Sequence, residues 1–342
     1  MLDFRSDTVT RPDEAMRRAM AAAEVGDDVY REDPTAIRLE ERAAEIVGTQ
    51  AALFTPSGTM ANQIALHLHG SRGEEVVGEG LLHVFHYEMG AMSALSGLFP
   101  RPVAGHRGRL EPADLEAAIQ PDLEYKSRTR ILVLENTHNL AGGIAFRPEV
   151  TGPLLAVARR YGLVVHLDGA RLFNAAVALD LRPSDLTAGV DSVMISLSKG
   201  LGCPVGGLLC GPAGFVAEAR RVRKMLGGGM RQVGVLAAAG LVALERGFEH
   251  LRDDHANARR LAAGLAELPG VTLDEEALQT NILMVELAAD EAADLTPAAR
   301  FVAWLREREI LASAISATRV RFVTHRDVGR DAVEEALGRL GG

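Results

Sequence analysis

The sequence predicts an α/β protein whose main sheet is mostly parallel. Three short runs of apolar, largely β-branched residues in the middle third carry this prediction, at 131–134, 163–167 and 192–196. Helical stretches such as 154–161 separate them. Near-continuous apolar strands that alternate with helices are typical of a parallel sheet covered on both faces. With 342 residues, the chain is long enough for one large α/β enzyme or for two or three domains.

The N-terminal third begins with a polar arm that prolines interrupt, and then forms βα-like units. We expect helices at 13–23, 39–47 and 60–68, and strands at 51–54 and 75–77. The strand at 51–54 leads through Thr55-Pro56-Ser57-Gly58-Thr59 into the third helix, which is amphipathic.

The C-terminal third changes pattern. A strand at 205–210 is followed by an Ala/Leu-rich helix to about 246, a helix at 251–268, a strand at 281–287, a helix at 297–309, a strand at 319–324 and a last helix. This order suits a smaller α+β domain that closes over the large one. We therefore expect an N-terminal arm at 1–14, a large domain at 15–247 and a small domain at 248–342.

Composition excludes several classes of function. The net charge of −9 argues against non-specific nucleic-acid binding and against a basic membrane face. No apolar run is long enough to span a bilayer, and the N-terminus lacks a signal pattern. Two cysteines, Cys203 and Cys210, give no disulfide framework. We expect a reduced, cytoplasmic protein with neither nucleic acid nor membrane as a partner.

Lys199 is one of only three lysines, against 34 arginines. It lies between a β-type run and a glycine-rich turn. Lysine, unlike arginine, can lose its proton in a protein, and its neutral amine can attack a carbonyl. A Schiff-base lysine is therefore the first hypothesis, and a solvated loop lysine is the alternative.

Two further features stand at the ends of predicted strands, where open α/β sheets bind ligands. Gly58 and Thr59 begin a helix whose N-terminus favours a phosphate; plain N-capping by Ser57 or Thr59 is the alternative. Asp168 ends an apolar strand, where an ionised acid needs a cationic partner such as a protonated pyridine nitrogen. Arg171 has a fork suited to a carboxylate, and a structural Asp168–Arg171 pair is the alternative.

Lys199 ends the strand that follows Asp168, so both side chains are expected at one edge of the sheet. A phosphate cradle, a carboxylate for a ring nitrogen and an amine for an aldehyde are the fixed points of a pyridoxal phosphate site. Their order along the chain predicts such a site.

Longer motifs give the chain a family resemblance. They are FRSDTVT at 4–10, VGDDVY at 25–30, PSGTM at 56–60, ENTHN at 135–139, HLDGAR at 166–171, LSKGL at 197–201, RKMLGGGMRQ at 223–232 and RFVTH at 321–325. Through them the chain resembles the threonine aldolases, pyridoxal-phosphate enzymes of fold type I. The resemblance implies an aspartate-aminotransferase-like architecture with a mostly parallel seven-stranded sheet and a smaller α+β C-terminal domain. It also implies retro-aldol cleavage of L-threonine or L-allo-threonine to glycine and acetaldehyde.

The resemblance assigns cofactor binding to Gly58, Thr59, His83, Asp168, Arg171, Ser198, Lys199, Lys224 and Arg231. In that assignment Lys199 holds pyridoxal 5'-phosphate as a Schiff base, Asp168 holds its pyridine nitrogen, and His83 stacks on the ring. Lys224 and Arg231 would reach a neighbouring subunit's cofactor, and a solvated basic helix face is the alternative.

The same resemblance implies that Ser6, Arg171 and Arg321 clamp the substrate carboxylate. Arg319 lies two residues away on the same strand face, but Arg321 directly precedes the matching Phe-Val-Thr-His. The family also implies a homotetramer arranged as a dimer of dimers, and no metal is expected.

The sequence departs from the family at one position. Relatives often place a histidine that contacts the substrate hydroxyl in the loop before the strand leading to 135–139, and Tyr125 takes that place in this sequence. A phenol donates or accepts a hydrogen bond, but an unperturbed pKa of ~10 makes it a poor base at neutrality. Lys199, His83 and Tyr125 are the expected catalytic residues, with His83 or Tyr125 acting on the β-hydroxyl through water.

Two other functions stay open. Another fold type I reaction, such as aminotransfer or β-elimination, predicts transamination or pyruvate release with little acetaldehyde. A carrier or ligand-sensing regulator without turnover is the alternative outside the enzymes, although 342 residues leave no room for an added DNA-binding domain.

Overall fold

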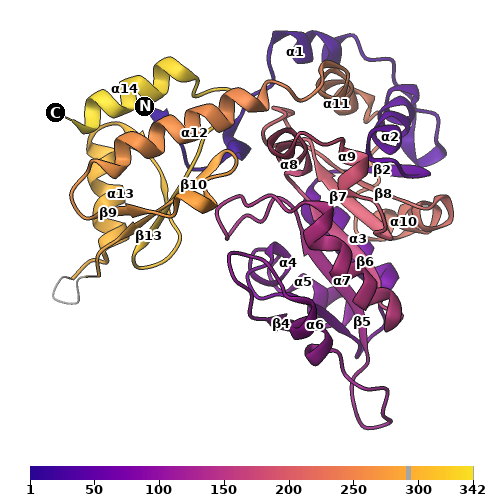
Figure 1. The fold of residues 1–342 in the computed structure, drawn as a ribbon. Helices are drawn as coiled ribbons and strands as arrows, with labels where there is room; N and C mark the ends of the chain where they lie inside the picture. Colours follow the sequence, from indigo (N-terminus) through magenta and orange to yellow (C-terminus); the bar gives the residue numbers. More distant parts are fainter. Residues whose placement is uncertain (290–293, 342) are drawn as a thin grey trace.

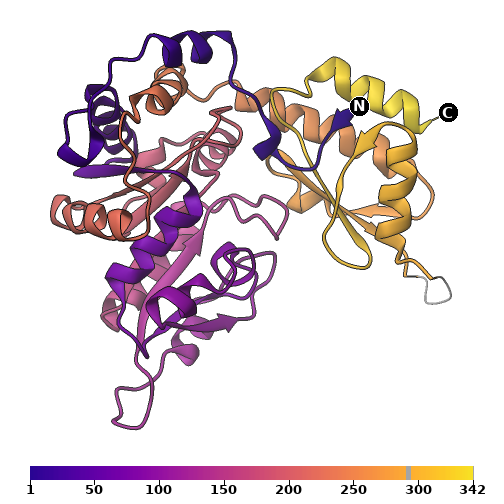
Figure 2. The same cartoon turned by 180° about the vertical axis from the view of Figure 1, so that it is seen from behind.

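The computed structural model describes residues 1–289 and 294–341 as two lobes (Figure 1). Residues 290–293 and 342, within the expected small domain, lie outside the described residues. The N-terminus lies beside the C-terminal lobe in both views (Figures 1 and 2). In the described part of the chain, no helix combines the length and the apolar character needed to cross a membrane.

The larger lobe is built on a seven-stranded sheet. Its strands are β2 (Ala51–Thr55), β3 (Glu75–Glu79), β4 (Phe99–Val103), β5 (Thr129–Glu135), β6 (Val164–Gly169), β7 (Ser192–Ser196) and β8 (Gly207–Gly211). They lie in the order β2-β8-β7-β6-β5-β3-β4. From β4 to β7 every pair is parallel, whereas β8 is antiparallel to both of its neighbours. The prediction of a mostly parallel sheet is confirmed.

Helices cover both faces of this sheet. They are α1 (Glu14–Ala21), α2 (Pro34–Val47), α3 (Gly58–His69), α4 (His83–His86), α5 (Ala91–Ser96), α6 (Pro112–Ala118), α7 (Pro148–Arg160), α8 (Leu172–Leu179), α9 (Pro183–Leu186), α10 (Ala213–Met225) and α11 (Gly234–Arg246). Alternation along β7 shows the two faces. Met194 packs with residues of α3 and α10, while Val193 and Ile195 join the core formed with α2, α7, α8 and α11.

Helix α2 begins earlier than its apolar pattern alone suggests. Pro34 occupies its first position, and the Asp33 side chain accepts the N–H of Ala36 at 2.9 Å. Gly48 ends the helix with φ of 71°. A capping aspartate, an initial proline and a left-handed glycine are the physical signals that set these bounds.

The smaller lobe contains a four-stranded antiparallel sheet in the order β12-β13-β10-β9. Its elements are α12 (Leu251–Ala266), β9 (Val271–Leu273), β10 (Ile282–Leu287), α13 (Pro297–Glu307), β12 (Ser313–Ala314), β13 (Arg319–Val323) and α14 (Arg330–Leu340). The short strand β1 (Leu2–Asp3) pairs in parallel with β11 (Ile310–Leu311), and Phe4 is fully buried against Phe322. The arm therefore begins on the smaller lobe before it reaches the larger one.

This topology brings the ends of the central strands together. Glu135, the last residue of β5, lies opposite Asp168 near the end of β6, and β7 ends three residues before Lys199. Because the strands are parallel, their carboxyl ends meet at one edge of the sheet. That edge faces the arm and the smaller lobe.

Candidate active site

A cavity of about 340 Å³ lies at this edge. It is lined by Ser6, Thr8, His83, Tyr87, Glu135, Thr137, Asn139, Asp168, Ala170, Arg171, Lys199, Ser313, Ala314, Ile315 and Arg321. These residues come from the arm, from both lobes and from the ends of several strands. A larger groove of about 780 Å³ also lies between the lobes, but none of the residues lining it is a predicted site residue.

Lys199 follows β7 on a tight turn. Its backbone carbonyl accepts the N–H of Gly202, which has φ of 79°, and the hydroxyl of Thr10 at 2.8 Å. Burial and the nearby Arg171 guanidinium lower the pKa of the Lys199 amine, against the opposing pull of Asp168. This shift is in the direction of the neutral, nucleophilic amine that the Schiff-base hypothesis requires.

Asp168 is almost fully buried, at 1% exposure. Its Oδ2 accepts from Asn62 Nδ2 at 2.8 Å, and its Oδ1 accepts the N–H of Ala170 at 3.0 Å. Among the residues that the structure describes, no cationic side chain forms an ion pair with it. A buried carboxylate in this state fits a protonated ring nitrogen of a ligand.

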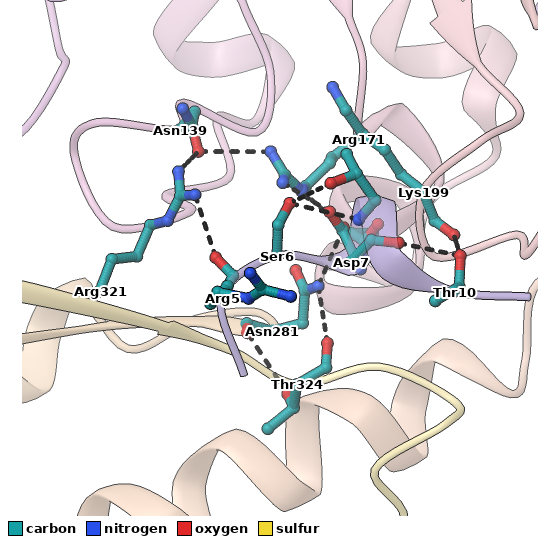
Figure 3. Close-up of polar contacts among 12 residues, drawn as sticks. Arg5, Ser6, Asp7, Thr10, Asn139, Arg171, Lys199, Asn281, Arg321 and Thr324 are labelled. Carbon is teal, nitrogen blue, oxygen red and sulfur yellow. Dashed lines mark hydrogen bonds and ion pairs between the residues drawn. The ribbon is translucent and has the colours of Figure 1, made fainter. Parts of the chain in front are cut away.

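The alternative of an Asp168–Arg171 pair is wrong, because Arg171 pairs with Asp7 of the arm (Figure 3). Arg171 Nε and Nη2 donate to the two Asp7 oxygens at 2.8 and 2.7 Å. Both side chains are buried, and Asn281 also donates to Asp7 at 3.2 Å. Sequence reasoning missed Asp7, although it stands within a quoted motif. The fork of Arg171 is thereby occupied, and only its Nη1 remains, at 3.4 Å from Asn139 Oδ1.

We expect Asp7→Asn to destabilise the fold by about 3–5 kcal/mol, because it leaves the buried Arg171 charge without a counter-ion. Chemical denaturation at neutral pH measures this loss. Asp3→Asn is the control, since the Asp3–Arg5 pair is partly solvated and contributes at most about 1 kcal/mol. A loss no larger in Asp7→Asn than in Asp3→Asn would contradict the account.

The Asp7–Arg171 pair also makes the stability of the fold depend on pH. Burial alone would raise the pKa of Asp7, but the Arg171 charge and hydrogen bonds outweigh it and lower this pKa to about 2. A depressed pKa means that Asp7 stabilises the fold above its unfolded pKa of about 3.9. That stabilisation is lost as the pH falls from about 4 to about 2.

Arg321 supplies an unsatisfied donor. Its Nη1 donates to Asn139 Oδ1 at 3.0 Å and its Nη2 to the carbonyl of Arg5 at 3.2 Å, as Figure 3 shows. Its Nε is buried and has no hydrogen-bond partner among the described residues. Ser6, whose Oγ accepts the N–H of Thr8 at 3.2 Å, lines the same cavity. Among the described residues Arg321 forms no ion pair, so its guanidinium, which lines the cavity, lacks a counter-ion that a ligand carboxylate would supply.

His83 also lines the cavity. Its backbone N–H donates to Glu135 Oε2 at 2.7 Å, and its ring Nδ1 lies 2.9 Å from Glu88 Oε1. Burial alone would lower the pKa of His83, but the hydrogen bond to Glu88 and the charge of Asp168 raise it. The ring of Tyr87 lies beside it, with 5.5 Å between the ring centroids.

Gly58 begins helix α3, at the end of the strand next to β8. The cap is Ser57, whose Oγ accepts the N–H of Met60 at 3.2 Å, as the N-capping alternative expected. A Cβ on Gly207 would lie 3.0 Å from the Gly58 Cα and one on Gly58 would lie 3.1 Å from the Met194 sulfur, so the close approach favours glycine at both positions. Gly58, Thr59 and Ser198 are not among the residues that line the cavity.

Besides Gly58, Thr59 and Ser198, three further predicted residues do not line the cavity of their own chain. Tyr125 is 81% exposed and precedes β5, whose seven residues span about 20 Å to the edge where the site lies. Tyr125 does not line the cavity of its own chain, and its contact with the substrate stays a prediction. Lys224 is exposed at the end of α10, and Arg231 is exposed and pairs with Asp27 at 3.0 Å. Their role at a neighbouring subunit stays a prediction.

The strand order, the lysine after β7 and the buried acid at the end of β6 together define an enzyme of fold type I, the pyridoxal-phosphate architecture with a large sheet and a smaller C-terminal lobe. The chain belongs to the beta-eliminating lyase family, whose model matches residues 3–288.

Curated relatives match along nearly the full length. The chain is 42% identical to low-specificity L-threonine aldolase 1 of Arabidopsis thaliana, over 98% of this chain and 94% of that protein. It is also 42% identical to the low specificity L-threonine aldolase of Escherichia coli strain K12, over 98% and 97%. Among solved structures, a threonine aldolase of Leishmania major covers all of both chains with a TM-score of 0.83, and its 22% identity shows the fold alone.

Proposed function

We propose that the chain is a pyridoxal-phosphate-dependent lyase that cleaves L-threonine, L-allo-threonine or both to glycine and acetaldehyde. The observation that carries this proposal is one cavity lined by Lys199, by Asp168 and by Arg321, where neither Asp168 nor Arg321 has an ion-pair partner among the described residues. The names of the 42% identical relatives supply the reaction, and the cavity supplies groups for its amine, ring and carboxylate.

The residues present fit the cofactor. Lys199 would hold its aldehyde carbon, Asp168 its ring nitrogen, and the N-terminus of α3 at Gly58 and Thr59 its phosphate. When bound, pyridoxal phosphate supplies a carbonyl that captures amines and a ring that takes up electrons from a breaking bond at Cα. His83 lines the same cavity and offers a ring face for stacking.

The cavity offers a separate place for each end of an amino acid, the amino group at the Lys199 side and the carboxylate at Arg321. Asp7 neutralises Arg171, so Arg321 is the cation left for the substrate carboxylate, with the Ser6 hydroxyl beside it. Fixing the carboxylate fixes which Cα bond stands perpendicular to the ring. This orientation favours cleavage between Cα and Cβ over loss of the α proton.

His83 would take the proton of the β-hydroxyl. Its Nδ1 is bonded to Glu88, while its Nε2 has no hydrogen-bond partner among the described residues. Nε2 in its neutral state can accept a proton directly or through one water. With Tyr125 outside the cavity, His83 is the base that this chain offers.

The proposal is tested by incubating purified, cofactor-loaded protein with L-threonine and with L-allo-threonine in separate reactions. Acetaldehyde and glycine are measured in each. Turnover of at least one isomer is expected. A fully loaded protein that yields neither product from either isomer would overturn the proposal.

We expect Arg321→Met to raise the KM for the amino acid about 10–100-fold, because it removes a charged hydrogen-bond donor from the substrate carboxylate. Steady-state kinetics on the cleaved isomer measure the change. Arg319→Met is the matched control on the same strand, since Arg319 pairs with Glu286 at 3.3 Å outside the cavity. Equal KM values for the two variants would remove Arg321 from the binding of the carboxylate.

A second candidate function is β-elimination, which the description of the matching family favours. It would use the same Lys199 and Asp168 but would release a keto acid and ammonia. The product analysis separates it from retro-aldol cleavage.

The assembly belongs to the proposal as well. We propose a cytoplasmic homotetramer, a dimer of dimers, in which Lys224 and Arg231 reach the neighbouring subunit's cofactor. The side chains of Lys224 and Arg231 are both exposed. Met225, which follows Lys224, is 64% exposed, and Tyr30 on the same lobe is 71% exposed.

A further inference from the structure

Glu88 is a buried acid that the proposed chemistry does not use. It follows α4 and is 2% exposed. Its Oε1 accepts from Asn62 Nδ2 at 2.8 Å and lies 2.9 Å from His83 Nδ1, and its Oε2 accepts from Gln63 Nε2 at 2.5 Å. Three side-chain donors converge on this one buried carboxylate, and both of its oxygens accept. Glu88 is therefore built to hold those donors in place.

The contact with Glu88 determines which ring nitrogen of the neutral His83 side chain carries the hydrogen. An ionised carboxylate only accepts, so His83 must carry a hydrogen on Nδ1. The ring then turns Nε2 away from Glu88, and that nitrogen has no hydrogen-bond partner among the described residues. The backbone N–H of His83 is held separately, by Glu135. Glu88 thus sets both the tautomer and the direction of the ring.

Asn62 links this pair to Asp168. Its Nδ2 donates one hydrogen to Glu88 and the other to Asp168, each at 2.8 Å. Its Oδ1 lies 3.0 Å from Nε2 of His166. Burial lowers the pKa of His166 to about 3, so this ring is neutral and donates from Nε2 to Asn62. The amide of Asn62 therefore cannot flip without losing three contacts.

This amide also argues against a metal at the cluster. One ligand atom each from His83, Glu88 and Asp168 lie within 4.8 Å of one another. The Asn62 amide group donates into both carboxylates and so presents its positive end to the space between them. The cluster is a hydrogen-bond junction between two acids.

The charges of the junction are complementary. When Nε2 takes up a proton, Glu88 compensates the imidazolium that forms, which leaves the negative charge of Asp168 for a cationic ligand group. Without Glu88, Asp168 would be the acid left to attract the imidazolium. Glu88 therefore separates the two functions of the cavity, a proton on His83 and a charge at Asp168.

We propose that Glu88 is the positioning residue of the site, which holds His83 by Nδ1 with Nε2 free for proton transfer and, through Asn62, reserves Asp168 for the ligand. Its catalytic meaning rests on the proposed function, but the contact itself is testable without turnover. Glu88 touches neither substrate nor cofactor in this account and acts through His83.

Several groups face the His83 ring and set its charge. Glu88 and Asp168 favour the imidazolium, Lys199 after β7 opposes it, and the Tyr87 ring lies alongside. The net effect is a raised pKa, so His83 stays protonated to a higher pH than a free histidine. Loss of the Glu88 charge must move its titration to lower pH.

Glu88→Gln removes the negative charge of Glu88 and leaves the size and shape of the side chain almost unchanged. The new side-chain oxygen can still accept from His83 and Asn62, while the new N–H₂ group faces Gln63. Gln63 can rotate its amide to accept, because its own Oε1 has no hydrogen-bond partner at present. The variant keeps the packing and a full set of hydrogen bonds, and it loses one negative charge.

The readout is carbethoxylation of His83 by diethyl pyrocarbonate, which attacks neutral imidazole. Bound cofactor is first removed from the full-length chain with hydroxylamine. The modification is then monitored by peptide mass spectrometry. The ring is accessible, since 27% of the His83 side chain is exposed. Rates are measured from about pH 5.5 to 8.5, around the unperturbed histidine pKa. His86, which is exposed, is the internal control.

In Glu88→Gln we expect the midpoint of His83 to fall by about one pH unit or more, so that modification below both midpoints is about tenfold faster. The rates should converge at high pH, and His86 should not change. Glu149→Gln, which removes an exposed charge from α7, should leave His83 unchanged. An unshifted His83 midpoint in Glu88→Gln would overturn the proposal.

A second variant keeps the test open if Glu88→Gln does not fold. Gln63→Met removes one donor from Glu88 and leaves a stronger acceptor for His83, so the midpoint should rise. A fall or no change would contradict the proposal. Should the protein cleave no threonine while Glu88→Gln still shifts His83, the proposed function falls and the role of Glu88 stands.

Discussion

Lys199→Ala is expected to lower the rate of threonine cleavage by about 10⁴-fold or more, since it removes the only nucleophilic amine that the described structure places in the cavity. Single-turnover and steady-state assays on the cleaved isomer measure the loss. A visible spectrum of the variant mixed with pyridoxal phosphate should lack the band of a protein-bound imine. Full turnover by Lys199→Ala would refute the scheme.

Lys199→Arg is the matched control for charge. Arginine keeps a cation at the position but cannot lose its proton, so it should be as inactive as alanine. Partial activity would mean that the positive charge, not the amine, carries the effect. The stability of Lys199→Ala should not fall appreciably, because burial already disfavours the charged form of the native lysine.

Asp168→Asn is expected to lower kcat/KM by about 10²–10³-fold, the usual loss when one electrostatic group at a reacting centre is removed. The carboxylate is buried without a cation of its own among the described residues, so its charge is free to act on a ligand. The variant also turns an amide N–H₂ toward Asn62, which adds a lost hydrogen bond to the lost charge. Kinetics and cofactor affinity are measured together.

The control for Asp168→Asn is Asp331→Asn, which neutralises an exposed acid in the first turn of α14. This variant should keep native kinetics and native cofactor affinity. Unchanged cofactor affinity and kcat/KM in Asp168→Asn would remove the ring-nitrogen role from Asp168.

The central strands were predictable because burial on both faces makes them apolar throughout. Residues 131–134 and 192–196 lie within β5 and β7. β4 (Phe99–Val103) was not predicted: prolines at 100 and 102 do not suggest a strand, and only its place at the sheet edge tolerates them. The sequence pattern therefore predicts the central strands of the sheet better than its edge strands.

The site was predictable where a residue's place follows from the strand that it ends. Asp168 and Lys199 meet because their strands are parallel neighbours. The partner of Arg171 was not predictable, since Asp7 lies on the far arm and no local spacing connects the two. Glu88 gave no signal either, because a single acid two residues before Gly90 belongs to no motif and ends no predicted strand. The place of Tyr125 was not predictable from the strand pattern, because Tyr125 lies in the loop that precedes β5 and not at the edge where β5 ends.

The most direct test of the account is the product balance from threonine in the wild-type protein. Glycine, acetaldehyde, keto acid and ammonia are measured in one reaction, with Lys199→Ala as the blank. The account predicts glycine and acetaldehyde in a one-to-one ratio that accounts for the threonine consumed. Consumption of threonine with keto acid and ammonia in place of glycine would contradict it.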